Sequence, residues 1–362
     1  MGRHLCPMLS LTYTKRTLRF RFPARTSRGA LATHTAYYLR LFDPANPTVA
    51  GLGEAAPLAG LSPDYGPDFE ARVSQLCRDF TGESRSEFSA AEASQLLPTW
   101  PALRFALETA ALDWQHGGRR QLYRNAFGLG QATLPINGLV WMGDAGFMRE
   151  QIQQKLTEGY SCLKLKIGSL DFETELGLLA EIRAVAGPDR LVLRVDANGA
   201  FAPAEALDKL HRLADFAVHS IEQPLGAGQP GALAALCRAS PVPVALDEEL
   251  IGVTDPAAQA ALLDAVRPAY LVLKPTLLGG HAATRRWIAL AEARGIAWWI
   301  TSALESNVGL NAVAQLTGEY DVGGFAQGLG TGQLYHNNVA APLFIHAGTL
   351  RYDPDGAWEL PA

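Results

Sequence analysis

The chain has 362 residues, 48% of them hydrophobic and 19% charged, which is the composition of a globular protein with a large core and about two domains. Its formal net charge of -5 lacks the basic excess of nucleic-acid-binding surfaces, so we expect no nucleic-acid partner. Four cysteines without CxxC spacing, and no signal-peptide or membrane-spanning stretch, favour a reduced cytoplasmic protein without membrane contact.

The N-terminal part of the chain carries the pattern of an α+β domain. Residues 9–43 alternate between apolar and polar side chains, which predicts two antiparallel strands joined by a loop at residues 23–30. The segment 51–67 is rich in turn residues, and we expect a loop there. Helical patterns follow at residues 68–80, 90–97 and 101–114.

From Leu134 onward the pattern changes to short apolar strands separated by amphipathic helices. Eight candidate strands fall within about 200 residues, as a TIM barrel requires. They are PINGLVWM, LKLKIG, LVLRVDAN, SIEQPL, VALDEEL, YLVLKPT, AWWITSALES and GGFAQGLG. We predict an α/β fold, a modified TIM barrel of the (β/α)7β type over residues 131–334. Residues 1–130 form an α+β capping domain, to which residues 335–362 return.

Four charged residues follow successive candidate strands at nearly equal spacing. Asp196, Glu222, Asp247 and Lys274 are separated by 26, 25 and 27 residues, which is about one strand-helix unit. Strand ends of a barrel meet at one mouth, so we expect the three carboxylates to bind a hard divalent cation, Mg²⁺ before Mn²⁺. No His or Cys cluster favours zinc. For any single carboxylate, a helix cap or a salt bridge is the alternative.

Two lysines precede this series on one candidate strand. Lys164 and Lys166 lie 32 and 30 residues before Asp196 and share one face at strand period, so both point into the barrel. A lysine serves as a general base only when its pKa falls toward the working pH, and a neighbouring positive charge has that effect. Lys274, four strands further round, is expected to face Lys166. The alternative is that one of the pair is a salt-bridge partner of the carboxylates.

A divalent metal beside lysine bases suits the removal of a weakly acidic proton next to a carboxylate. The series of two lysines, Asp196, Glu222, Asp247 and Lys274 resembles the muconate-lactonizing-enzyme subgroup of the enolase superfamily. The resemblance covers nearly the whole chain, the capping domain included.

Several stretches resemble the o-succinylbenzoate synthase family in particular. They are GLGEAAPL from Gly51, PALRFALE from Pro101, PING from Pro135, TSALESNVG from Thr301 and GLGTG from Gly328. The resemblance implies a hydro-lyase of menaquinone synthesis that dehydrates 2-succinyl-6-hydroxy-2,4-cyclohexadiene-1-carboxylate to 2-succinylbenzoate. It implies that Lys166 removes the proton and then protonates the departing hydroxyl. Lys274 is expected over the ring, and Lys164 beside the carboxylate.

Other functions are weighed by what the chain lacks. A mandelate racemase is expected to carry a histidine on the seventh strand, and AWWITSALES has none. A dipeptide epimerase is expected to carry DxD on the eighth, and residues 323–332 contain no acid. N-succinylamino acid racemase, alone or as a second activity, stays the main alternative, since it shares the lysines, the metal and the succinyl group. A non-catalytic binding protein on this fold is the remote one.

Weaker candidates for substrate contact complete the site. Asn198 is expected to hold a metal ligand in place, and Arg194 either contacts substrate or neutralises nearby acids. Ser302 and Glu305 are candidates for the succinyl arm or for contacts with the lysines. Segments 23–30 and 51–62 are candidate lids. The remaining candidates are Gly328, Arg25 and Arg28. The partner is a small carboxylate, and a homo-oligomer stays open.

Overall fold

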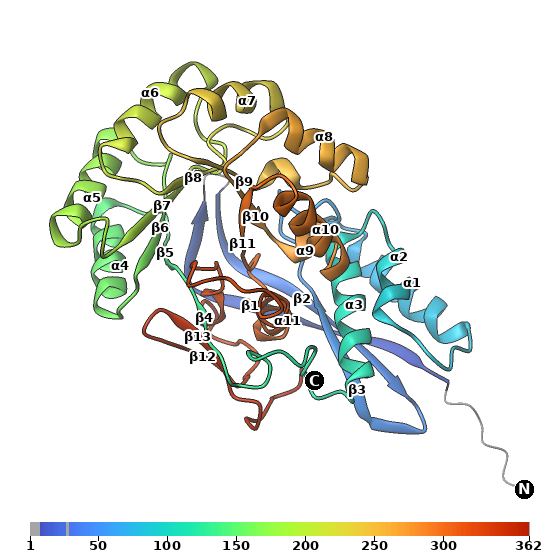
Figure 1. Ribbon diagram of the computed structural model, residues 1–362. Helices are drawn as coiled ribbons and strands as arrows, with labels where there is room; N and C mark the ends of the chain where they lie inside the picture. Colours follow the sequence, from blue (N-terminus) through green and yellow to red (C-terminus); the bar gives the residue numbers. More distant parts are fainter. Residues whose placement is uncertain (1–7, 27–28, 362) are drawn as a thin grey trace, which may run out of the picture.

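The computed structural model describes residues 8–26 and 29–361, and it has two parts (Figure 1). An antiparallel sheet with order β1-β2-β3 lies beside a parallel sheet with order β11-β10-β9-β8-β7-β6-β5. Helices α4 to α8 form an arc outside the parallel strands in Figure 1. The α/β fold, a modified barrel with an N-terminal capping domain, is as the sequence predicts.

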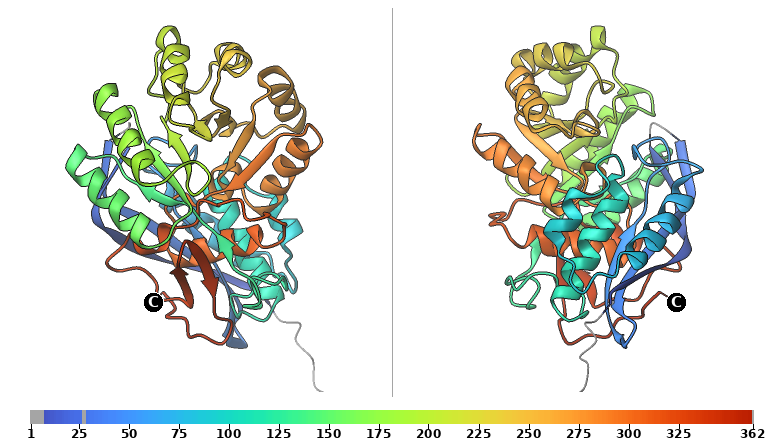
Figure 2. Two further views of the ribbon diagram at one scale, coloured as in Figure 1. Left: turned by 60° about the vertical axis from the view of Figure 1, so that its left-hand side comes forward. Right: turned by 90° about the vertical axis from the view of Figure 1, so that its right-hand side faces the viewer.

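The capping domain combines a long hairpin with three helices. Its elements are β1 (Ser10–Thr26), β2 (Gly29–Asp43), β3 (Asn46–Ala55), α1 (Phe69–Gly82), α2 (Ala90–Gln95) and α3 (Pro101–Gln115). Strand β1 extends further than the predicted loop allows, because Pro23 falls where the register with β2 shifts, between Arg19 and Ala24. A proline is tolerated there, since the ladder needs no N–H at an irregularity. The sheet and its helices lie together on one side of the molecule (Figure 2).

We expected a loop throughout the turn-rich segment that starts at Gly51. The structure differs, because the first residues of this segment are the end of β3. A Cβ on Gly51 would lie 2.0 Å from the carbonyl oxygen of Ala110, and a Cβ on Gly53 would lie 1.9 Å from that of Ala106. Both carbonyls belong to α3, which packs directly on β3. The two glycines therefore permit a close approach of helix and sheet rather than a turn.

The barrel strands are short and almost entirely buried, because helices cover them outside and side chains fill the centre. The strands are β5 (Gly138–Val140), β6 (Cys162–Lys166), β7 (Val192–Asp196), β8 (Ser220–Glu222), β9 (Val244–Leu246), β10 (Tyr270–Leu273) and β11 (Ala297–Ile300). The helices are α4 (Ala145–Thr157), α5 (Phe172–Val185), α6 (Pro203–Ala214), α7 (Pro230–Ala239), α8 (Pro256–Val266), α9 (Pro275–Leu278), α10 (His281–Glu292) and α11 (Asn307–Thr317). Two 3₁₀ turns, η1 (Glu248–Leu250) and η2 (Thr331–Gln333), follow strand ends.

The predicted eighth strand is reduced to two residues. Gln327 bridges Ile136 and Gly328 bridges Thr301, so the pair joins the two edges of the parallel sheet. The Gln327 N–H donates to Pro135 O at 2.8 Å, and the Gly328 N–H donates to Ile300 O at 2.8 Å. These bonds close the barrel without a regular strand.

The C-terminal residues contact two neighbours. Leu334 and His336 bond to the backbone of β1, at Arg21 and Arg19 respectively. Beyond them, β12 (Leu343–His346) and β13 (Thr349–Tyr352) form a small sheet with β4 (Leu134–Pro135), which lies next to the barrel. In the described part of the chain, no helix has the length and apolar character needed to span a bilayer.

Candidate active site

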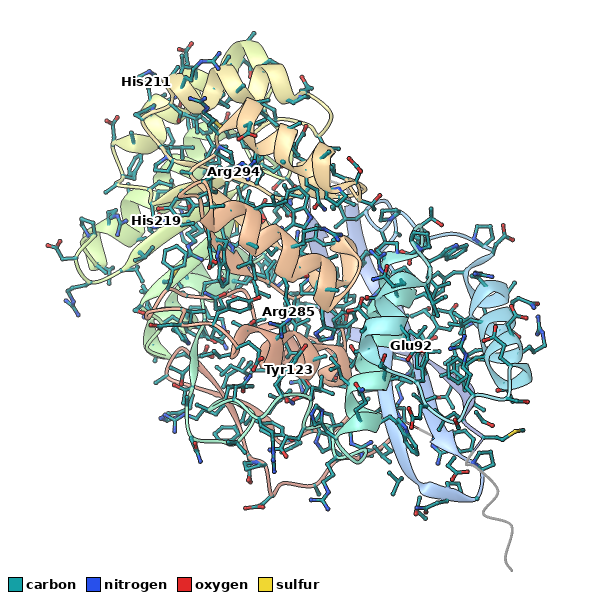
Figure 3. All side chains as sticks on the ribbon, turned by 45° about the vertical axis from the view of Figure 1, so that its right-hand side comes forward. Glu92, Tyr123, His211, His219, Arg285 and Arg294 are labelled. Carbon is teal, nitrogen blue, oxygen red and sulfur yellow. The ribbon has the colours of Figure 1, made fainter. Side chains whose placement is uncertain are left out.

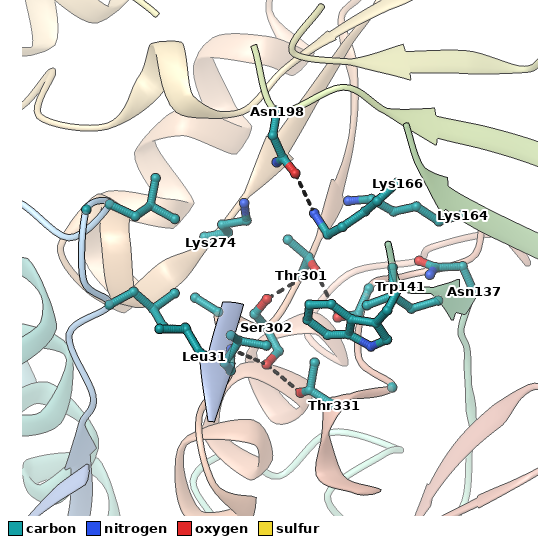
Figure 4. A pocket seen from close by; sticks show the side chains of 18 of the residues that line it. Leu31, Asn137, Trp141, Lys164, Lys166, Asn198, Lys274, Thr301, Ser302 and Thr331 are labelled. Carbon is teal, nitrogen blue, oxygen red and sulfur yellow. Dashed lines mark hydrogen bonds between the residues drawn. The ribbon is translucent and has the colours of Figure 1, made fainter. Parts of the chain in front are cut away.

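A cavity of about 340 Å³ opens at the carboxyl ends of the barrel strands, beneath the capping domain. The capping domain contributes the hairpin tip at Gly29–Leu31 and the segment Leu58–Leu61. Apart from Leu31, these residues belong to the segments 23–30 and 51–62 that the sequence suggested as lids. The barrel contributes Lys164 and Lys166 opposite Lys274, and its neutral side chains, among them Thr301, Ser302 and Thr331, lie below the three lysines in Figure 4.

Parallel register brings the predicted charged residues together. Lys166 pairs with Asp196 across β6 and β7, and Asp196 pairs with Glu222 across β7 and β8. The three side chains project from the same end of neighbouring strands because parallel strands end at one edge. Lys274 lies just after β10, and its ammonium group points toward those of Lys164 and Lys166 from the opposite side (Figure 4). The predicted opposition of the lysines is present.

The lysines and carboxylates form a buried network of ion pairs. Lys164 Nζ lies 2.5 Å from Glu222 Oε2 and 2.9 Å from Asp196 Oδ2. Lys166 Nζ lies 2.9 Å from the same Asp196 oxygen, and Lys274 pairs with Asp247. All of these side chains are nearly inaccessible to solvent, so each charge depends on its partners for neutralisation.

Contact with carboxylates raises the pKa of two lysines at this site. Burial lowers the pKa of Lys164, but the carboxylates of Asp196 and Glu222 outweigh burial and raise it overall. The pKa of Lys274 is also raised, because Asp247 and the neighbouring Glu248 outweigh its burial. Direct contact with carboxylates at hydrogen-bond distance therefore has a larger effect than the neighbouring ammonium groups.

The three carboxylates suit a hard divalent cation. Burial raises the pKa of Glu222 well above its ordinary value, and the Asp196 and Asp247 carboxylates raise it further. One of its oxygens, Oε1, is buried and has no hydrogen-bond partner among the described residues. In residues 8–26 and 29–361, no three Asp, Glu, His or Cys side chains already form a metal-binding group, since lysine ammonium groups lie between the carboxylates. An all-oxygen donor set with one unpartnered oxygen fits a cation such as Mg²⁺.

Two amide side chains hold this network in place. Asn198 accepts a hydrogen bond from Lys166 Nζ at 2.9 Å and donates to Glu248 Oε1 at 3.1 Å, so it orients the lysine as well as the strand end. Gln223, which the sequence analysis missed, accepts the backbone N–H of Asp247 and of Glu249 through its Oε1. The Glu249 carboxylate instead accepts the Gly228 N–H at 2.9 Å. Asp247 is therefore the member of its acidic run that faces the lysines.

Ser302 and Glu305 have different positions from each other. Ser302 lines the cavity, and its hydroxyl lies 2.6 Å from both Glu305 Oε2 and Thr331 Oγ1. Glu305 is fully buried behind it and also accepts hydrogen bonds from the Ala303 N–H and the Thr276 hydroxyl. The suggestion that Glu305 contacts the lysines or the substrate is wrong, because local donors occupy both of its oxygens.

Arg194 lies below the cavity rather than in its lining. Its guanidinium lies 4.2 Å from the ring centre of Trp299 and 4.3 Å from that of Phe325, and it donates to Ala326 O at 2.7 Å. We suggested contact with substrate or with acids, whereas aromatic faces and a carbonyl surround the charge. His219, on the barrel side of the molecule in Figure 3, packs against the same Phe325 and is structural.

Three candidates for substrate contact remain, namely Gly328, Arg25 and Arg28. Gly328 lines the cavity, and a Cβ there would lie 2.0 Å from Thr301 Oγ1, so only glycine fits. The backbone of Arg25 pairs with Ala30 at the hairpin tip. The side chain of Arg25 and the whole of Arg28 lie outside the described residues.

Sequence reasoning missed most of the uncharged side of the cavity. We call this side the neutral wall, and it comprises Leu31, Asn137, Trp141, Thr301, Ser302 and Thr331. Asn137 is buried, and its Oδ1 has no hydrogen-bond partner among the described residues. The family-like stretches PING and TSALES contain three of these residues, Asn137, Thr301 and Ser302, which was the available signal.

Comparison with known proteins assigns the family. The family model described as enolase C-terminal domain-like matches residues 147–354. The chain is 45% identical to the o-succinylbenzoate synthase of Desulfotalea psychrophila, over 94% of this chain and 98% of that protein. The solved structure of MenC from Desulfotalea psychrophila matches with a TM-score of 0.84 and 42% identity, over 95% of this chain and 99% of that one. An N-succinylamino acid racemase from Amycolatopsis is 28% identical over 91% of this chain and 88% of that protein.

Proposed function

Because the chain belongs to the enolase superfamily, in its muconate-lactonizing-enzyme subgroup, we propose that it is an o-succinylbenzoate synthase. The enzyme is a hydro-lyase of menaquinone synthesis. It removes water from 2-succinyl-6-hydroxy-2,4-cyclohexadiene-1-carboxylate and forms the aromatic product 2-succinylbenzoate.

One observation carries the proposal beyond family membership. Lys166 and Lys274 face each other across a single cavity, directly beside three buried carboxylates from neighbouring strands (Figure 4). Lys166 is the base, Lys274 supplies a positive charge, and the three carboxylates would bind a metal beside the substrate carboxylate. Removal of a proton next to a carboxylate requires all three.

Lys166 performs both proton transfers. Its Nζ takes the proton from the ring carbon that bears the carboxylate, and the electron pair of the broken C–H bond moves into that carboxylate to form an enolate. When the pair returns to the ring, the C–O bond to the hydroxyl breaks. The proton held by Lys166 passes to the leaving hydroxyl, which departs as water. Asn198, 2.9 Å from Nζ, orients the lysine during both transfers.

The other two lysines stabilise the charge that develops. Lys274 enters from the opposite side, where its ammonium lies over the ring of the intermediate and is attracted to the π face. Lys164 lies near Lys166 on the same strand, and its ammonium group helps to bind the substrate carboxylate. The side chains of both lysines are only slightly exposed, so their charges act with limited screening by solvent.

Asp196, Glu222 and Asp247 are the residues that would hold the metal. Members of the superfamily use a divalent metal, and we propose Mg²⁺ because the donor set consists of carboxylate oxygens. When bound, such a cation stabilises negative charge on the substrate carboxylate.

The neutral wall receives the succinyl arm. Ser302, Thr301 and Asn137 present hydroxyl and amide groups to the cavity, and Gly328 adds backbone. Thr301, Ser302 and Asn137 lie below the lysines in Figure 4, where they line the other part of the same cavity. Trp141 and Leu31 exclude water from the same side.

The test is direct conversion of the cyclohexadiene substrate by the purified protein with Mg²⁺, followed by chromatographic detection of 2-succinylbenzoate. We expect turnover at enzymatic rates. Absence of product above the uncatalysed rate would refute the proposal.

The opposed lysines also favour a second candidate, N-succinylamino acid racemase. Two bases on opposite faces of one carbon are what racemisation needs, and the Amycolatopsis relative carries that name. Incubation with N-succinyl amino acids in D₂O decides between the two. Deuterium exchange without dehydration of the cyclohexadiene would reverse the ranking, and exchange together with dehydration would show both activities.

We also propose that the protein acts in the cytoplasm on this small carboxylate without a nucleic-acid or membrane partner. The metabolic role and the formal net charge of -5 support this proposal. A homo-oligomer is compatible with it, and light scattering measures the mass in solution.

A further inference from the structure

Glu54 contacts Ser306 and Gly309 at the interface between the domains, and the proposed chemistry uses none of the three. Glu54, at the end of GLGE in β3, is fully buried. Its Oε1 accepts the Ser306 N–H at 2.7 Å. Its Oε2 accepts the Ser306 hydroxyl at 2.6 Å and the Gly309 N–H at 2.7 Å. A capping-domain carboxylate therefore binds the first turn of α11, which begins at Asn307.

The glycine in this stretch makes room for the contact. A Cβ on Gly309 would lie 3.1 Å from Glu54 Oε2 and 2.6 Å from the Cβ of Glu305. Any larger residue would push the carboxylate away from the helix end. The positions of Glu54, Ser306 and Gly309 thus form one fitted contact, 252 to 255 residues apart in sequence.

The contact continues into the cavity wall through Glu305. This residue precedes Ser306, and its two oxygens hold the Ser302 hydroxyl at 2.6 Å and the Thr276 hydroxyl at 2.7 Å. Ser302 lines the cavity, and Thr276 comes two residues after Lys274. The β11–α11 loop is therefore held between the capping domain and the turn that follows the second lysine.

The same glutamate stands at the base of a lid segment. Strand β3 ends one residue after Glu54, and Leu58–Leu61 at the cavity follow within a few residues. Tyr38 on β2 is paired with Glu54 in register and is itself buried. One carboxylate thus anchors both the segment that covers the cavity and the loop that forms its neutral wall.

We propose that Glu54 is a positioning residue for substrate binding, which docks the capping domain on α11 and thereby sets Ser302 and the Leu58–Leu61 segment at the cavity. This inference rests on the proposed dehydration. It predicts that loss of the contact weakens substrate binding more than it slows proton transfer, because Lys166 and its partners lie on other strands.

Glu108 on α3 offers a matched control. It is also a buried glutamate of the capping domain, and its Oε2 accepts the Ala282 N–H in the first turn of α10 at 3.1 Å. The two glutamates share burial, domain and helix-end contact. Glu108 does not line the cavity or touch the β11–α11 loop.

The experiment compares E54Q and E108Q for KM, kcat and Tm. In E54Q the amide turns an N–H group toward the Gly309 N–H, so we expect KM for the cyclohexadiene substrate to rise about tenfold with kcat within about threefold. We expect E108Q to lower Tm while KM stays within about twofold. If E54Q does not fold, S306A removes the hydroxyl partner and should raise KM in the same direction.

Hydrogen exchange gives a readout that needs no substrate. We expect faster exchange at Thr301–Ser306 in E54Q and unchanged exchange there in E108Q. An unchanged KM in both E54Q and S306A with lowered Tm, or unchanged exchange at this loop, overturns the positioning role. If the wild-type protein produces no 2-succinylbenzoate, the proposed function falls, and the exchange result alone then decides on the docking contact.

Discussion

The two walls of the cavity are built in different ways. The charged wall consists of Lys164, Lys166, Lys274 and the carboxylates Asp196, Glu222 and Asp247, all at or near the ends of five consecutive strands. The neutral wall combines β5, β11, the closure segment at Gln327–Thr331 and pieces of the capping domain. One wall is periodic in sequence, and the other is assembled from distant segments.

The charged wall carries the groups for catalysis, and the neutral wall carries the groups for substrate binding. The charged wall holds groups that move protons and stabilise charge, and its members are bonded to each other at hydrogen-bond distance. The neutral wall contains hydroxyl, amide and apolar groups whose arrangement depends on Glu305 and Glu54 behind them. Changes to the first wall should reduce kcat, and changes to the second should mainly raise KM.

The largest effect is expected for K166A. Because one side chain serves first as the base, as a neutral amine, and then as the acid, as the ammonium, its loss should reduce kcat by about 10³-fold or more. Single-turnover dehydration measures the chemical step directly. K155A, which removes a partly exposed ion pair with Glu158 outside the cavity lining, is the control and should retain activity. A kcat for K166A near that of the wild type would rule out the assigned role of this lysine.

A smaller loss is expected when one carboxylate of the charged wall becomes neutral. E222Q keeps the shape and removes one negative ligand, so we expect kcat to fall about 10²-fold and the Mg²⁺ requirement to increase. A Mg²⁺ titration followed by thermal shift reports binding independently of turnover. E249Q is the matched control, since that carboxylate bonds to Gly228 instead. Equal Mg²⁺ midpoints in E222Q and wild type would contradict the ligand assignment.

On the neutral wall, S302A should separate binding from catalysis. We expect KM to rise about five- to tenfold with little change in kcat, because one hydrogen bond to a charged group is lost. Steady-state kinetics with the cyclohexadiene substrate measures both constants. S94A, in the exposed helix α2, should behave as wild type. If S302A lowered kcat alone, the division between the two walls would be incorrect.

The smallest effect concerns the anchor of the neutral wall. Burial raises the pKa of Glu54 from 4.5 to about 7. The folded protein therefore keeps this proton while the unfolded chain releases it, so the stability contribution is present below about pH 4.5 and is lost as pH rises to about 7.

The corresponding measurement compares stability at two pH values. Between about pH 6 and pH 8, the free energy of unfolding of the wild type should fall by on the order of 1 kcal/mol more than that of E54Q, which lacks the titrating carboxyl. Urea unfolding at both pH values provides the numbers. E150Q changes an exposed glutamate and should keep the wild-type slope. Identical slopes in E54Q and wild type would show that Glu54 titrates normally.

Sequence patterns predicted helices and strands well where the spacing of apolar residues reflects the face that packs into the core. The helix at Pro101–Gln115 and the strand at Cys162–Lys166 follow from their apolar periodicity. Turn composition misled at Gly51 and Gly53, because a glycine required for close helix packing looks the same as a glycine in a turn. The role of Glu305 was also missed, since its donors come from Thr276 and Ser302 through the folded loop.

The sequence by itself determined the (β/α) repeat, the identity of the charged groups and their common edge, because parallel strands of equal spacing place their ends together. Only the tertiary structure decided which charges touch, that Arg194 faces aromatic rings, and which segments form the neutral wall. Those contacts join residues on different strands, 58 positions apart for Lys164 and Glu222 and 132 for Arg194 and Ala326. Periodicity is a local property of the chain, whereas such contacts depend on the packing of whole domains.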